Sequence, residues 1–202
     1  MWGWGFLEAH PDYALAHGDA ALFAQRADGG CRQIGWACRY VQRSIEHPTG
    51  AQRLLDHLTH YSTTWYSMQR TEHLRHIYQQ TAAAGQGLYF LELLPSCLSV
   101  IRGKAKKLDR LYMVREGHAG MNSRKERDQG DLFDWVADPS WPGHYQRFRD
   151  CLAEALARQD GLTIAEASGI VKRAFWPYLV HAMAQPMPGS EARPPRSFYL
   201  QV

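Results

Sequence analysis

The chain has 202 residues and carries 23 Lys and Arg against 20 Asp and Glu, which gives a net charge of +3 with His neutral. That balance is too mild to indicate nucleic-acid binding by itself. Hydrophobic residues make up 45% of the chain, which is enough for a substantial core. We expect a single globular domain over residues 1–184 and a proline-rich tail over 185–202.

Targeting and membrane signals are missing from the sequence. Residues 1–8 lack the basic start and continuous apolar run of a signal peptide. The most apolar stretch, residues 87–101, contains Glu92 and Pro95 and is shorter than the ~20 residues that a spanning helix needs. Four cysteines without a C-x-x-C pair are typical of free thiols in a reducing compartment. We therefore expect a cytoplasmic protein that has no membrane partner.

A β-hairpin is predicted over residues 20–41. The turn sequence Asp28-Gly29-Gly30 lies between two apolar and aromatic runs, and glycine reaches positive φ without a steric penalty. A hairpin ahead of helices argues against a plain helical bundle. The predicted fold class is α+β, predominantly helical.

The central part of the chain is expected to alternate between helix and strand. A helix starts at Thr49 or Gly50 and runs to residue 61, and helical spacing resumes over residues 65–77 after a bend at 62–64. Residues 88–94 are interpreted as a strand rather than a buried helix, because Gly precedes them and Pro follows them. A short helix over 96–107 and a strand over 110–115 complete this part.

The C-terminal part is expected to be helical after a polar loop over residues 115–131. A helical turn is predicted at 131–136, a loop at 138–143 and an amphipathic helix at 144–158. Thr163 and Glu166 have the spacing of a capping box, which starts a last helix toward residue 183. Pro177 is expected to interrupt that helix.

Basic side chains gather in two places and are candidates for binding phosphate, because Lys and Arg neutralise and hydrogen-bond phosphate oxygens. The phosphate would belong to a nucleic acid or to a cofactor pyrophosphate; the plainer interpretation is a solvated basic face. The candidates are Arg102, Lys104, Lys106, Lys107 and Arg110 in the first group, and Arg124, Lys125 and Arg127 in the second.

Two histidine pairs have the i, i+3 spacing that lets neighbours on a helix hold a metal. They are His57 with His60 and His73 with His76. On one continuous helix the two pairs would face opposite sides, so a joint site needs a break near residues 62–64. No metal site is predicted, and whether either pair binds a metal stays open.

The N-terminal aromatic residues, the hairpin and the 88–94 segment together resemble GNAT-type acyltransferases, in particular the toxin-activating lysine acyltransferases. The matching positions are Trp2, Trp4, His10, Gly35-Trp36-Ala37 and Tyr89-Phe90-Leu91-Glu92-Leu93. Glu92 stands where that family has Asp, and the helical stretch 47–87 has no counterpart in its pattern. The resemblance covers under half of the chain.

The resemblance implies a catalytic role for two residues. His10 would act as general base and Glu92 would orient its imidazole. Backbone N–H groups near Leu93 would stabilise an oxyanion. The donor would be acyl-CoA or an acyl carrier protein, with its pantetheine phosphate held by the basic residues 102–107.

Two functional hypotheses follow from these features. The favoured one is a non-catalytic accessory or adaptor protein, without a cofactor, that binds a protein or nucleic-acid partner through a basic and aromatic surface. It is favoured because the sequence contains no strong catalytic signature. The alternative is the small acyltransferase.

Overall fold

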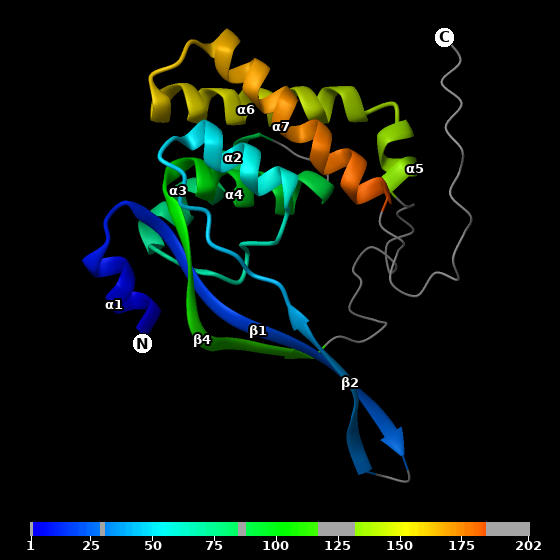
Figure 1. Ribbon diagram of the computed structural model, residues 1–202. Helices are drawn as coiled ribbons and strands as arrows, with labels where there is room; N and C mark the ends of the chain where they lie inside the picture. The colour runs from blue at the N-terminus through cyan, green and yellow to red at the C-terminus, as the bar shows by residue number, and fades with distance from the viewer. Residues whose placement is uncertain (1, 29–30, 85–87, 117–131, 185–202) are drawn as a thin grey trace.

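The computed structural model describes residues 2–28, 31–84, 88–116 and 132–184 (Figure 1). The fold class is α+β and predominantly helical, as the sequence predicts. Within these ranges no helix is long and apolar enough to cross a membrane. The expected tail over 185–202 lies outside the described residues.

The described residues form seven helices and four strands. Their bounds, in chain order, are α1 (Trp2–Ala9), β1 (Tyr13–Asp28), β2 (Cys31–Tyr40), α2 (Gly50–Thr59), β3 (Met68–Gln69), α3 (Thr71–Ala83), α4 (Leu88–Arg102), β4 (Lys104–Glu116), α5 (Leu132–Ala137), α6 (Trp141–Asp160) and α7 (Ile164–Ala184).

The sheet is built around β1, which pairs along both of its edges. β1 and β2 form the expected hairpin, in antiparallel register from Ala20↔Tyr40 to Asp28↔Cys31. Along the opposite edge β1 pairs in parallel with β4, beginning at Tyr13↔Lys104. β3 adds a short antiparallel pairing at residues 15 and 16. The strand expected at 110–115 is therefore confirmed, and β4 extends it toward the N-terminus.

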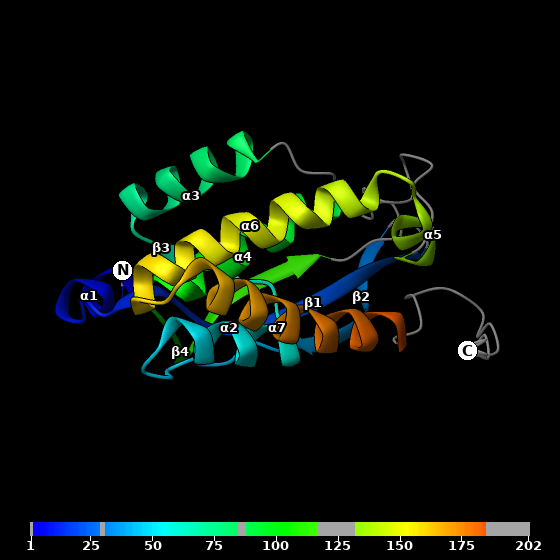
Figure 2. The same cartoon turned by 90° about the horizontal axis from the view of Figure 1, so that it is seen from above.

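The helices form a layer over one end of this sheet. Figures 1 and 2 show α2, α4, α6 and α7 packed side by side, with the hairpin reaching away from them and α3 at the outer edge. The core of the helical layer contains Phe90, Phe148 and Phe175, and the rings of the first two stack with centroids 4.5 Å apart. A smaller cluster of Leu15, Ile45, Val100 and Ala105 joins the sheet to α4.

The prediction of a strand at 88–94 is wrong, because these residues open helix α4. In its first half the buried apolar residues Phe90, Leu93, Leu94 and Cys97 have the spacing of one helix face, and in its second half the helix is buried continuously to Ile101. Pro95 lies inside the helix and removes one backbone hydrogen bond. Packing of the buried face outweighs that loss, and α4 continues to Arg102.

Three further expectations need correction. The helix expected over 96–107 ends at Arg102, and a one-residue turn at Gly103 leads into β4. Only glycine fits this turn, because a Cβ atom there would lie 2.8 Å from the backbone nitrogen of Ala14. The helix expected over 65–77 starts at Thr71, after a loop and β3. Helix α7 passes through Pro177 without ending.

The local start signals of two helices are confirmed. Thr49 caps α2 by accepting a hydrogen bond from the Gln52 backbone nitrogen at 3.2 Å. At the start of α7 the Thr163 backbone nitrogen donates to the Glu166 carboxylate at 2.9 Å, and the Glu166 backbone nitrogen donates to the Thr163 hydroxyl at 3.3 Å. This is the reciprocal pairing of a capping box.

Buried polar contacts join α2 to α4 within the helical layer. His57 Nε2 lies 2.9 Å from the Ser96 hydroxyl, which in turn lies 2.9 Å from the Thr64 hydroxyl. The Ser99 hydroxyl donates to Gln69 at 2.9 Å. Burial of the imidazole lowers the pKa of His57 to about 3, so His57 is neutral in the folded protein.

Because His57 is buried and neutral, we expect the protein to lose stability in mild acid. Below pH ~6.5 the unfolded chain protonates His57 while the folded protein does not, so the free energy of unfolding falls by up to about 1.4 kcal/mol per pH unit from this group. We expect His57→Gln, measured by urea unfolding between neutral pH and pH ~4.5, to have a shallower pH dependence than the wild type. Equal slopes for the two proteins would contradict the assignment.

Candidate functional site

Most of the predicted basic cluster is neutralised by acidic partners from other elements. Lys104 pairs with Asp12 at 2.8 Å, Lys106 with Glu46 at 2.9 Å and Lys107 with Asp19 at 2.9 Å. Arg110 is exposed on β4. The second group, Arg124, Lys125 and Arg127, lies outside the described residues.

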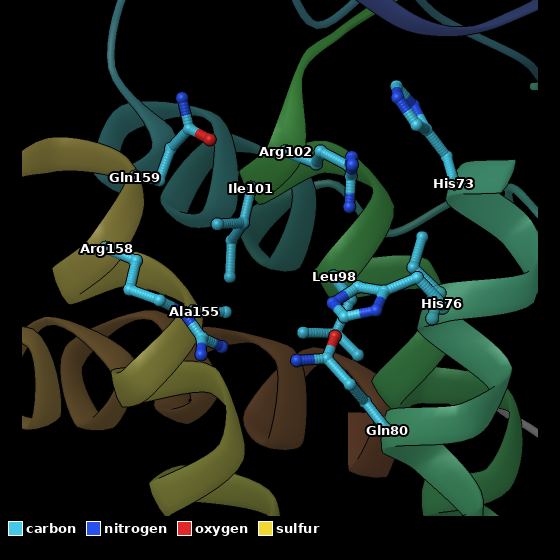
Figure 3. A pocket seen from close by; sticks show the side chains of 10 residues that line it. His73, His76, Gln80, Leu98, Ile101, Arg102, Ala155, Arg158 and Gln159 are labelled. Atoms are coloured by element: carbon cyan, nitrogen blue, oxygen red, sulfur yellow. The ribbon is translucent and has the colours of Figure 1, made fainter.

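Arg102 is placed differently, because it lines a cleft of about 370 Å³ where α3, α4 and α6 meet (Figure 3). We call this hollow the cationic cleft. Its walls are His73, His76, Ile77, Gln80, Leu98, Ile101, Arg102, Ala155, Arg158 and Gln159. Among the residues that the structure describes, no Asp or Glu lines it.

The helix α3 brings its two histidines to the cleft through a simple spacing. His73, His76 and Gln80 share a face with Ile77, because residues three and four positions apart are neighbours on a helix. Ile77 is buried and fixes that face against the helical core. His73 and His76, the histidine pair whose metal binding the sequence leaves open, are therefore both cleft residues.

The two arginines come from helix ends. Arg102 is the last residue of α4, and Arg158 lies in the last turn of α6. A helix C-terminus carries partial negative charge, which stabilises a cation there. This explains how two arginines and two imidazoles are tolerated around one hollow.

The charges in the cleft act on His73. Burial, followed by the positive charges of Arg102 and Arg70, lowers the pKa of His73, and Glu72 opposes this shift. The Nδ1 atom of His73 is buried and has no hydrogen-bond partner within the described part of the chain. An anion between His73 and Arg102 would relieve the repulsion and raise the pKa of His73.

The histidine pairs do not form a metal site in the described chain. No group of three or more His, Cys, Asp or Glu residues there has the geometry to hold a metal ion. His57 is buried against Ser96, whereas His60 is exposed and contacts Asp56 at 3.1 Å. The non-helical stretch between α2 and α3 separates the two pairs without bringing them together.

The two residues implied by the acyltransferase resemblance lie at different ends of the fold. His10 follows α1, where its Nδ1 atom is 2.8 Å from the Phe6 carbonyl and its ring stacks on Phe6. The nearby start of β1 meets the far end of α4, because the Lys104 backbone nitrogen donates to the Asp12 carbonyl at 3.0 Å.

Glu92 is exposed near the beginning of α4, ten residues before Arg102. Ten helical residues span ~15 Å. The structure therefore does not join His10 and Glu92 in a pair. The backbone near Leu93 belongs to a helix, so its N–H groups do not form the strand-based oxyanion site that the resemblance implies.

Comparison with known protein families, with curated proteins and with solved structures gave no match. The cationic cleft is the feature of the described residues that bears most directly on function. Of its basic residues, the sequence predicts Arg102 as a phosphate-binding residue, and it leaves open whether His73 and His76 bind a metal. Arg158 was missed, and its signal is a basic residue in the last turn of an amphipathic helix.

Proposed function

We propose that this protein is a non-catalytic, cytoplasmic nucleic-acid-binding protein that holds a phosphate group in the cationic cleft. The single observation that carries the proposal is the convergence of four basic side chains from three helices on a hollow whose described lining is free of acidic residues. They are His73, His76, Arg102 and Arg158.

The chemistry of the lining suits phosphate oxygens. A guanidinium presents a fixed fork of N–H donors that matches phosphate in a bidentate way. The amide groups of Gln80 and Gln159 add neutral donors at the same hollow. Together these groups provide charge neutralisation and several directed hydrogen bonds.

Exposed aromatic rings near α3 support nucleic acid as the carrier of that phosphate. Tyr78, on α3, contacts the Trp65 ring in an edge-to-face arrangement with centroids 5.6 Å apart. Both rings are more than one-third exposed. The guanidinium of Arg115 lies over the ring of Tyr66, 4.7 Å from its centroid. Such rings accept unpaired bases by stacking.

The acyltransferase alternative stays a prediction of the sequence. The proposal does not depend on His10 or Glu92, and no contact between them supports a catalytic pair. The lysines of β4 that would hold a pantetheine phosphate are engaged by Asp12, Glu46 and Asp19.

The test is binding of a fluorescently labelled oligonucleotide, followed by anisotropy from about 50 to about 200 mM salt. We expect affinity to fall with added salt, and Arg102→Ala and Arg158→Ala each to weaken binding by roughly tenfold or more, because each removes charged hydrogen bonds. Arg75→Ala is the matched control, since Arg75 is exposed on α3 and is not among the cleft residues.

Two results would overturn the proposal. One is a wild-type affinity that does not change with salt. The other is an Arg75→Ala variant that loses as much affinity as Arg102→Ala, because binding would then follow net charge and not the cleft. Thermal unfolding of each variant shows that it is folded.

A further inference from the structure

Several basic side chains of the described chain are not free to neutralise the phosphates of a nucleic-acid backbone. Six of them are held by carboxylates within 4 Å, at separations of 2.7–2.9 Å. A protein that follows a backbone neutralises successive phosphates with successive free cations. The paired residues are Arg39, Arg43, Lys104, Lys106, Lys107 and Arg149.

The cationic cleft has the opposite character, because it concentrates basic groups in one hollow. Two permanent cations, Arg102 and Arg158, and two imidazoles surround about 370 Å³. Figure 3 shows His76, Gln80 and Arg102 around the same opening, with His73 above it. This arrangement suits one compact and highly charged group.

An internal phosphodiester and a terminal phosphomonoester differ in charge. An internal phosphodiester of a nucleic acid carries one negative charge. A phosphomonoester carries about −1.5 to −2 at neutral pH and presents three strong acceptor oxygens. A terminal phosphomonoester therefore matches the number of cations and the number of donors in the cleft more closely than an internal phosphodiester does.

We propose that the cationic cleft recognises the terminal phosphate of a nucleic-acid end. This inference rests on the proposed function and specifies which phosphate of the nucleic acid is bound. Arg102 and Arg158 neutralise the monoester, and the amide of Gln80 donates to one of its oxygens. His73 becomes protonated on binding, because a bound dianion favours the charged imidazole.

The protonation of His73 provides a readout that is independent of oligonucleotide affinity. The charged groups that act on it are Arg102 of α4 and, on its own side, Arg70 and Glu72; His76 of α3 and Arg158 of α6 share the cleft. Burial, followed by the charges of Arg102 and Arg70, lowers the pKa of His73, and a bound dianion should raise it by offsetting those charges. Titration of the imidazole resonances by NMR, with and without inorganic phosphate, measures this shift. If the pKa of His73 is unchanged at saturating phosphate, the role assigned to His73 is wrong.

The main test compares three labelled oligonucleotides of one sequence, with a 5′-phosphate, with a 3′-phosphate or with hydroxyl groups at both ends. We expect one phosphorylated form to bind at least tenfold more tightly than the unphosphorylated form. Arg102→Ala should abolish this preference, and Arg75→Ala should keep it. Inorganic phosphate should compete with the preferred oligonucleotide.

The outcomes separate the two proposals. If all three oligonucleotides bind equally and Arg102→Ala weakens each of them equally, the terminal-phosphate inference is wrong and nucleic-acid binding stands. If none of them binds, both proposals fall. A preference that survives in Arg102→Ala places the recognition elsewhere on the protein and overturns the inference.

Discussion

Replacing Arg53 with Ala is expected to destabilise this protein by about 3 kcal/mol or more. Arg53 belongs to α2 and is only 3% exposed. Its Nε and Nη2 atoms each donate at 2.7 Å, to the carbonyls of Val100 and Ile101. Its Nη1 atom donates at 3.0 Å to the carbonyls of His47 and Pro48.

The size of this effect follows from what Arg53 satisfies. The carbonyls of Val100 and Ile101 belong to the last turn of α4, where the helix itself offers no donor. Removing the guanidinium leaves buried carbonyls without partners, and each costs about 1–3 kcal/mol. Burial also lowers the pKa of Arg53, and the negative charge of Asp160 opposes that shift.

Urea unfolding of matched variants measures the contribution of Arg53. Arg53→Lys should recover only part of the stability, because a single ammonium cannot reproduce a fork that reaches four carbonyls. Arg173→Ala is the control, since Arg173 is exposed on α7. An Arg53→Ala variant within about 0.5 kcal/mol of the wild type would show that these bonds do not stabilise the fold.

Truncation of Phe90 is the second large effect that we expect. The Phe90 ring is fully buried in α4 and lies 4.5 Å from the ring of Phe148 and 4.8 Å from that of Trp135 between centroids. The ring of Phe175 completes the cluster, with its centroid 6.2 Å from that of Phe90. Phe90→Ala leaves a cavity among these rings and should cost about 3–5 kcal/mol.

The adjacent residue offers a control for Phe90. Leu91 belongs to the same turn of α4 and is 39% exposed. Leu91→Ala should change the free energy of unfolding by less than about 1 kcal/mol, because the site is open and alanine favours helix. Equal losses for Leu91→Ala and Phe90→Ala would contradict the burial of Phe90 and the exposure of Leu91.

Signals that act over a few residues were the ones that the sequence predicted well. The pairing of β1 with β2, the Thr49 cap and the Thr163–Glu166 capping box each depend on neighbours in the chain. The strand prediction for residues 88–94 is wrong because it treats the flanking Gly87 and Pro95 as boundaries, whereas Pro95 lies inside α4. The aromatic cluster around Phe90 is formed by residues from α5, α6 and α7, and no local pattern reveals that packing.

In the candidate site too, the sequence reveals local features but not the contacts between distant elements. Arg102 and the His73–His76 pair were visible as residue types, but their meeting depends on how α3 packs beside α4 and α6. The lysines of β4 looked like a phosphate-binding cluster because their partners, Asp12, Asp19 and Glu46, lie far away in the chain. Charge clusters in a sequence therefore predict a binding surface only where folding leaves them free.

The parallel pairing of β1 with β4 has a consequence for the way the chain is made. During synthesis β1 and β2 leave the ribosome early and pair locally, whereas β4 follows only after α2, α3 and α4. Until then the second edge of β1 has unpaired backbone groups, which other strands can join. Closure of a contact so distant in the chain is slow. The interval before β4 arrives is thus the period in which the nascent protein is most exposed to aggregation.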